Sequence, residues 1–329
     1  MLGGEEQYLF GLLDHDGEPS WKLWEFRQIA EEAKLLEEKR LFPRKRQPEI
    51  AIAYSFEDLL ISEYAKDYYT VSHRDQAVEA FTAAYRLNRD CALVDLREIE
   101  NQYRVLILPG NAEMTPETEA SIRKQLEGGA TVIMTAFSAK VDENNQVFDT
   151  SLPGRLCDVF GVKVRGFDRA VTHVSAVNVG SLEKTPMKLL RRKVSIGKNG
   201  ETWLDEINYH EFLELTTAQP LVEYEGAEGP FTTAISCNPY GKGKAIYVGV
   251  PADEKMLRKL LEDVCAIQPA FNGLPLGIAA RALDEDKTLY VNTTREPLTF
   301  PGEGRGLFTG KEYKGQVCLP PYEVELLER

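Results

Sequence analysis

Three short runs of almost uniformly apolar residues place the strongest constraint on the fold of this chain. They are Glu49–Phe56 (EIAIAYSF), Tyr103–Gly110 (YRVLILPG) and Ala130–Phe137 (ATVIMTAF). A strand that is apolar on both of its faces must be covered on both faces, which is typical of parallel sheets in α/β proteins. The runs therefore predict a sheet whose strands are buried from end to end.

Helical segments alternate with these runs. Asp75–Leu87 has helical periodicity, Cys91–Leu96 reads as a further strand, and a helix is expected between the second and third apolar runs. That helix has clear boundary signals, with Thr115 as N-cap, Pro116 at the first helical position and Gly128-Gly129 at its end. Strands alternating with helices predict a doubly wound parallel sheet that is covered on both faces.

The second half of the chain is less regular. A helix ending at Gly161 and then a strand are expected, after which Thr172–Glu225 reads only as mixed and β-rich. Thr232–Val250 predicts a hairpin that turns at Asn238-Pro239-Tyr240-Gly241, and Asp253–Ala266 predicts an amphipathic helix. From about Asn272 only short strands and turns remain, which indicates a small antiparallel β-domain.

A helix from Ser20 to about Arg40 precedes the first apolar run. Trp21 and Trp24 fall near one face of it, and two such large side chains require an apolar surface to cover them. No partner for that face is evident in the neighbouring sequence. The helix therefore predicts that a further protein segment, not evident in the neighbouring sequence, covers this apolar face.

Composition and charge exclude several classes of function. With 39 Lys and Arg against 52 Asp and Glu, the net charge of −13 disfavours binding to nucleic acid or anionic membranes. The basic run Arg44–Arg46 reads as a solvated linker, and neither a membrane span nor a signal peptide is visible. The cysteines are scattered, so a reducing, cytoplasmic location without disulfides is expected for Cys91, Cys157, Cys237, Cys265 and Cys318.

Motifs that could carry chemistry are weak. An amidotransferase needs a cysteine on a sharp turn, but Thr135–Ala139 offers only Ser138, which reads as a turn serine. Gly241–Lys244 (GKGK) joins two strands and so reads as a solvated turn, and Val141–Asn145 reads as an acidic loop without the pattern of a Ca²⁺ site. No metal-ligand spacing and no cofactor motif is found, and no catalytic residue is assigned; the four histidines are far apart in sequence at His15, His73, His173 and His210.

Five stretches, taken in order, resemble glycoside hydrolase family 42, the β-galactosidases. Gly3–Ser20 resembles the end of that family's catalytic barrel, and Asn238–Gly249 resembles the closing hairpin of its trimerisation domain. The resemblance implies that this domain is α/β, with a flavodoxin-like (class I glutamine amidotransferase-like) doubly wound parallel sheet that lacks the amidotransferase cysteine. Its other matching stretches and the matching C-terminal β-domain are Gly128–Phe148, Leu152–Asp168 and Leu307–Glu328.

The resemblance implies that a (β/α)8 barrel carrying both catalytic glutamates comes first and is not encoded here. Trp21 and Trp24 would then belong to the last barrel helix. Gly4-Glu5-Glu6 matches the family stretch whose glutamate hydrogen-bonds galactose, which places Glu6 in that substrate-binding role. Leu9 stands where some members have a histidine, a departure from the family pattern.

The expected organisation is a remnant of the last barrel βα unit plus linker at 1–47, a trimerisation domain at 48–270 and a C-terminal β-domain at 271–329. The first hypothesis is a homotrimeric assembly module of a retaining β-galactosidase, inactive alone, whose barrel is held elsewhere in the full enzyme or encoded by a neighbouring gene. The alternative is a stand-alone protein that binds a sugar or another small molecule at the carboxyl-end crevice of the sheet. An amidotransferase-type enzyme is a third hypothesis, which a glutaminase assay would test.

Overall fold

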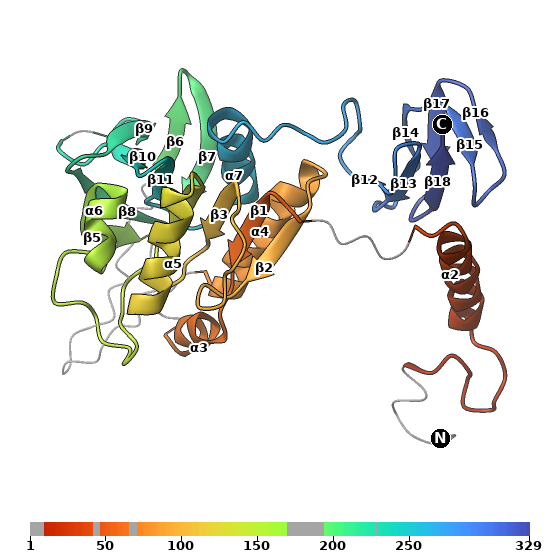
Figure 1. The fold of residues 1–329 in the computed structure, drawn as a ribbon, viewed down its shortest axis with the longest axis horizontal. Helices are drawn as coiled ribbons and strands as arrows, with labels where there is room; N and C mark the ends of the chain where they lie inside the picture. Colours follow the sequence, from red (N-terminus) through yellow and green to blue (C-terminus); the bar gives the residue numbers. More distant parts are fainter. Residues whose placement is uncertain (1–9, 42–46, 66–70, 170–193, 228) are drawn as a thin grey trace, which may run out of the picture. The chain divides into compact units, whose positions relative to one another are not determined.

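A computed structural model describes residues 10–41, 47–65, 71–169, 194–227 and 229–329 (Figure 1). By its internal contacts the chain divides into two compact units. The larger unit is Pro48–Phe271, and the smaller unit combines Met1–Gln47 with Asn272–Arg329. The three-domain organisation expected from the sequence, with boundaries after residues 47 and 270, stays a prediction. The internal contacts place most of its first and third domains in one unit.

The larger unit is built on a nine-stranded sheet with the order β2-β1-β3-β4-β11-β10-β9-β6-β7. The first five of these strands are parallel, and their order is that of a flavodoxin-like sheet. These parallel strands are β1 (Ile50–Ala53), β2 (Cys91–Val94), β3 (Val105–Leu108), β4 (Thr131–Thr135) and β11 (Gly243–Val248). The predicted doubly wound fold is confirmed.

Antiparallel strands extend this sheet beyond β11. They are β10 (Thr233–Tyr240), β9 (Gln219–Tyr224), β6 (Val194–Lys198) and β7 (Glu201–Ile207). A separate two-stranded sheet pairs β5 (Val162–Arg169) with β8 (Tyr209–Leu215). Much of the segment from Thr172 to Glu225 is therefore β-structure, while residues 170–193, with His173, lie outside the described part.

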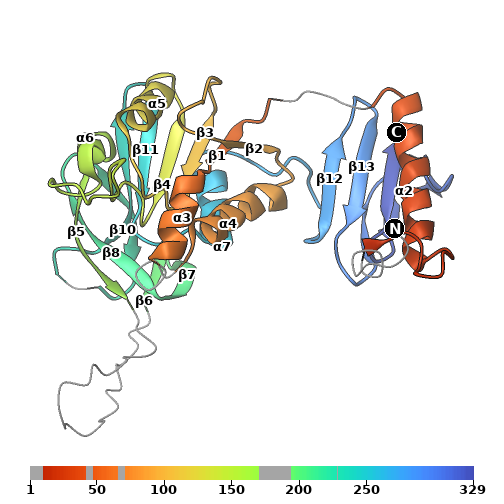
Figure 2. The same cartoon turned by 90° about the horizontal axis from the view of Figure 1, so that it is seen from below.

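Helices cover both faces of the sheet (Figure 2). One face packs against α4 (His73–Arg86) and α7 (Glu254–Lys259), which continues as a π-helical turn over Leu260–Val264. The other face packs against α5 (Pro116–Glu127), a short 3₁₀ turn (Gly154–Leu156) and α6 (Cys157–Phe160). The predicted caps of α5 are present, since Thr115 accepts from the Thr118 N–H in a capping box.

One detail of the predicted hairpin is wrong. Strand β10 continues to Tyr240, so Asn238 and Pro239 lie within the strand and the turn is made by Gly241 and Lys242. A proline is tolerated at position 239 because β9 begins at Gln219, opposite Cys237, so the ladder on that side requires no N–H from residue 239.

The smaller unit contains α2 (Trp21–Glu38) and an antiparallel sheet with the order β12-β13-β18-β15-β16. Leu36 and Leu41 pack with Leu326 of that sheet in one apolar cluster. The predicted C-terminal β-domain is confirmed, with strands β12 (Ile278–Ala282), β13 (Lys287–Asn292), β14 (Leu298–Pro301), β15 (Gly304–Gly306), β16 (Glu312–Tyr313), β17 (Gln316–Leu319) and β18 (Val324–Glu328).

Candidate functional site

The carboxyl ends of the parallel strands are where a sheet of this type holds its ligands. The chain runs from β1 to β2 on one side and then returns to β3 on the other, so the strand order reverses between β1 and β3. The loops that follow these two strands carry Ser55, Asn111 and Glu113, and helix α3 (Phe56–Tyr64) begins directly after Ser55. This edge is therefore the candidate functional site.

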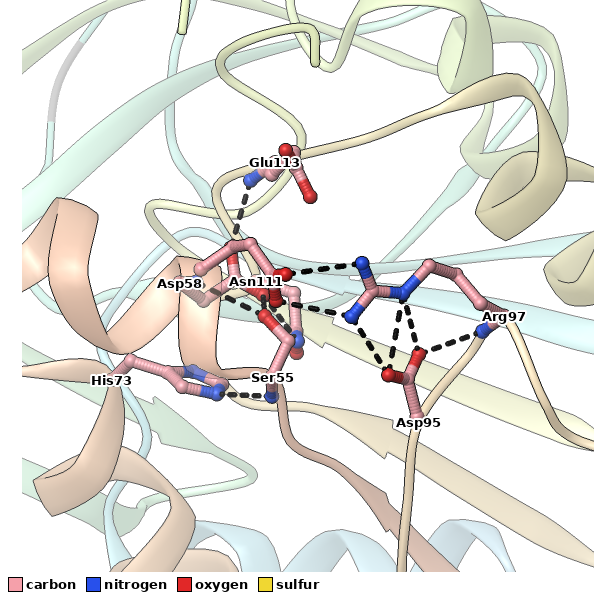
Figure 3. A network of polar contacts seen from close by, with 8 residues as sticks. Ser55, Asp58, His73, Asp95, Arg97, Asn111 and Glu113 are labelled. Atoms are coloured by element: carbon pink, nitrogen blue, oxygen red, sulfur yellow. Dashed lines mark hydrogen bonds and ion pairs between the residues drawn. The ribbon is translucent and has the colours of Figure 1, made fainter.

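A buried carboxylate, Asp58, lies at the centre of this edge (Figure 3). Its Oδ2 accepts from the Ser55 hydroxyl at 2.7 Å and from the Asn111 amide at 2.8 Å. Its Oδ1 accepts from the backbone N–H of Glu113 at 2.8 Å. Asp58 thus joins the loops after β1 and β3, and its oxygens are occupied by donors from the protein itself.

His73 is the only one of the sequence's histidines that the described structure brings to this edge. The Ser55 N–H donates to its Nε2 at 3.3 Å, which requires that Nε2 carry no proton. Nδ1 lies 2.9 Å from the Pro109 carbonyl oxygen and therefore donates to it. The ring also stacks on Tyr54 at 4.9 Å between centroids, and both ring nitrogens are engaged in hydrogen bonds with the backbone.

Arg97 closes the exposed side of the edge (Figure 3). Its guanidinium pairs with both carboxylate oxygens of Glu57, at 3.1 and 3.0 Å, and also with Asp95. Hydrogen bonds from Arg97 lower the pKa of both carboxyl groups. These ion pairs join the loop after β2 to the start of α3. Like the oxygens of Asp58, these charged groups are paired with other groups of the protein.

The pKa of Glu113 gives a testable pH dependence. Burial, and then repulsion by Asp58 and Glu57, raises this pKa above its ordinary value near 4.5. A carboxyl group with a higher pKa in the folded chain binds more protons when folded, so its contribution to stability grows as pH falls through that pKa. We expect Glu113→Gln to be slightly more stable than wild type at pH 7 and to lose this advantage toward pH 4.5.

Urea unfolding followed by circular dichroism at several pH values measures this difference. The comparison with the variant at each pH removes the contribution of every other titrating group. A difference between the two proteins that stays constant with pH, or that grows as pH falls, would contradict the assignment.

The turn after β4 is the position where an amidotransferase-like fold would carry its nucleophile. Phe137 adopts a left-handed backbone with φ of 72°, which is rare for a residue other than glycine. Its side chain is fully buried and lies 4.0 Å from the Tyr209 ring between centroids. Ser138 is also fully buried, and its hydroxyl is directed to the Leu108 carbonyl at 3.4 Å. The left-handed turn is present, but Phe137 and Ser138 are both fully buried in it.

A second buried carboxylate, Glu211 on β8, supports this turn. Its Oε1 accepts from Lys140 Nζ at 2.6 Å, from Tyr209 Oη at 3.1 Å and from the Phe137 N–H at 3.4 Å. Its Oε2 accepts from Tyr247 Oη at 2.7 Å. Burial, and then the charge of Glu211, raises the pKa of Tyr247, so that hydroxyl remains a donor. The Lys140–Glu211 ion pair therefore joins the segment after β4 to strand β8.

The remaining sequence motifs do not assemble into a site. Gly241 and Lys242 form the exposed turn between β10 and β11, and the Asp142 carboxylate accepts from the backbone N–H groups of Asn144 and Gln146. Among the described residues, no three potential metal ligands lie close enough to hold an ion. Within the same residues, no helix has both the length and the apolar content needed to cross a bilayer. Glu6 and the basic run at 44–46 lie outside the described residues.

Sequence reasoning missed both buried carboxylates. The spacing Ser55-x-x-Asp58 directly after a strand is that of a capping box and was a usable signal for Asp58. Glu211 and Lys140 are 71 positions apart, and no local pattern announces their pairing.

The comparisons with known proteins agree with this geometry. Residues 48–268 match the family model described as the β-galactosidase trimerisation domain of glycoside hydrolase family 42. The chain belongs to this family. The match spans the whole parallel sheet and its antiparallel extension, and the residues that follow it correspond to the C-terminal region of the same enzymes.

Curated relatives extend this family assignment over the chain. β-Galactosidase BgaA of Clostridium cellulovorans is 23% identical over 332 residues, covering 99% of this chain and 47% of its own length. β-Galactosidase BgaB of Geobacillus is 27% identical over 304 residues, covering 88% and 42%. The chain therefore spans about half the length of the curated relatives it matches, and the catalytic barrel of the family is not covered.

Solved structures show the same fold. A catalytic mutant of the family 42 β-galactosidase Gan42B from G. stearothermophilus has a TM-score of 0.80 at 21% identity, covering all of this chain and 47% of that one. The β-galactosidase of Bacillus circulans sp. alkalophilus has a TM-score of 0.79 at 22% identity, covering 100% and 48%. The fold of the trimerisation-domain family is thus retained across this chain.

Proposed function

We propose that this chain is the assembly part of a family 42 β-galactosidase and forms a homotrimer through residues 48–268 in the cytoplasm. The observation that carries the proposal is the family match over those residues, because the matched family model describes a trimerisation domain. The filled edge of the sheet fits a domain whose role is association and not chemistry. The enzyme that it serves would hydrolyse terminal β-D-galactosides with retention, using two carboxylates on a barrel held elsewhere.

The exposed apolar side chains of α2 support the proposal that this helix packs against a catalytic barrel in the assembled enzyme. Trp21 is 66% exposed, Trp24 is 61% exposed and Ile29 is 61% exposed within the described residues. Large apolar side chains gathered on one helix are typical of a surface that another protein segment covers. In the assembled enzyme these residues would pack against the barrel, and Glu6 would contact galactose hydroxyls.

Light scattering tests the assembly. We expect a particle of roughly three times the chain mass of 37.1 kDa, at a mass that does not change with dilution through the micromolar range. The variant Trp21→Glu/Trp24→Glu is the matched control, because it removes the apolar surface of α2 and leaves 48–268 intact. A trimer in both proteins supports the proposal. A monomer, or a trimer that the control variant abolishes, contradicts assembly through 48–268.

A chromogenic β-galactoside tests the catalytic part of the proposal. We expect no hydrolysis above a buffer blank, because retaining hydrolysis needs two carboxylates about 5 Å apart in a cleft and the edge residues are bound to one another. Activity that persists through repurification and that follows the protein peak would show that the chain carries a catalytic site of its own.

A further inference from the structure

A cavity of about 470 Å³ lies in the larger unit, away from the carboxyl edge of the parallel sheet. Its lining comes from the β6–β7 hairpin, from β9 and β11, and from the π-helical turn after α7. The volume is within the range of sites for small molecules, which is about 300–1,000 Å³. The lining residues are Lys198, Asn199, Glu201, Trp203, Leu221, Lys244, Asp263 and Val264.

A tight turn fixes one side of this cavity. Asn199 and Gly200 both have positive φ, 54° and 79°, as a type I′ hairpin turn requires. Lys198 and Glu201 are consequently paired directly across the hairpin. The geometry of the hairpin therefore places Lys198 and Glu201 next to each other in the lining of the cavity.

The charges at the rim do not cancel. Lys259, from α7, lies 2.5 Å from Glu201 and 4.0 Å from Asp263, so both acids share this lysine. The hydrogen bond to Glu201 accordingly raises the pKa of Lys259. Lys198 and Lys244 have no ion-pair partner within the part of the chain that the structure describes. Two ammonium groups are therefore available for an anion in a protein whose net charge is −13.

The lining of the cavity combines apolar residues with polar and charged ones. Trp203 is 3% exposed and packs in the core, while Leu221 and Val264 are half-buried beside it. The carboxylates of Glu201 and Asp263 and the amide of Asn199 can accept hydrogen bonds from hydroxyl groups. Such a lining suits a small molecule that presents C–H and O–H groups and also carries a negative charge.

We propose that this cavity binds a small hydroxylated anion, with Lys198 and Lys244 holding the charged group. The shared chemistry is that of a sugar phosphate or a sugar acid. The proposal rests on the lining of the cavity and does not require a sugar bound by Glu6.

Fluorescence of Trp203 is the direct readout. The sequence has three tryptophans, and Trp21→Phe/Trp24→Phe, both in the smaller unit, leaves Trp203 as the sole reporter. Glucose 6-phosphate and gluconate separate a phosphate from a carboxylate, while glucose and inorganic phosphate supply only one half of the ligand. We expect a saturable change with one of the two sugar anions and none with glucose.

Lysine variants in this background test the assignment. Lys198→Gln and Lys244→Gln should each weaken binding about tenfold, because each removes one charge near the anion. Lys242→Gln is the matched control, since this exposed turn residue carries the same charge and does not line the cavity. The absence of saturable binding by either sugar anion up to about 10 mM overturns the proposal. So does binding that both cavity variants leave unchanged, or binding of inorganic phosphate as tight as that of the sugar anion.

Discussion

Replacing Lys140 by methionine is expected to lower the free energy of unfolding of the larger unit by about 3–5 kcal/mol. Lys140 Nζ lies 2.6 Å from Glu211, and the two side chains are 5% and 0% exposed. Methionine fills a similar volume but removes the positive charge, which leaves the Glu211 carboxylate buried without its counter-ion. Chemical denaturation followed by far-UV circular dichroism measures the change.

Two further variants make this prediction specific. Lys255→Met, at an exposed position on α7, should change stability by less than about 0.5 kcal/mol. Adding Glu211→Gln to Lys140→Met removes the buried charge and should recover about 1 kcal/mol or more. A loss below about 1 kcal/mol for Lys140→Met alone would show that the pair does not hold the turn after β4.

Replacing Gly243 by alanine is expected to destabilise the larger unit by about 2–3 kcal/mol or more. A Cβ at this position would lie 2.1 Å from the carbonyl oxygen of Ala130 and 2.7 Å from that of Leu126. Both contacts are with backbone, which cannot move without shifting the end of α5 or the start of β4. The loss arises from this close approach, because the backbone of Gly243 is not in the left-handed region.

Gly166→Ala is the control for Gly243→Ala. Gly166 is also in a strand, and a Cβ there would meet only the Phe212 ring at the ordinary contact distance of 3.4 Å. We expect its unfolding midpoint in urea to stay within the range of typical surface substitutions. Equal effects of the two substitutions would contradict the steric argument.

The fold was predictable where local chemistry and burial point the same way. Val105–Leu108 is apolar on both faces and is fully buried in β3, and Thr115 with Pro116 begins α5 as their chemistry dictates. The π-helical turn after Lys259 and the extension of β10 through Pro239 were not predictable, because neighbouring strands and helices decide them.

The candidate site was less accessible to sequence reasoning than the fold. The turn after β4 lies within Thr135–Ala139 as predicted, and the interpretation of Ser138 as a turn or capping serine fits the hydrogen bond from its N–H to the Thr135 carbonyl. The burial of Phe137 and its support by Glu211 depend on residues brought together by β8, far along the chain. Pairings of this kind follow from topology, and the sequence around each residue contains no sign of them.

The division of the chain into two units sets an order for its synthesis. Helix α2 precedes Pro48–Phe271, whereas the strand that bears Leu326 follows it. At translation rates of about 5–20 residues per second, the helix leaves the ribosome on the order of tens of seconds before its sheet partner exists. During that interval the larger unit can fold, while Leu36 in α2 and Leu41 just after it lack their partner Leu326 and can be reached by cellular chaperones.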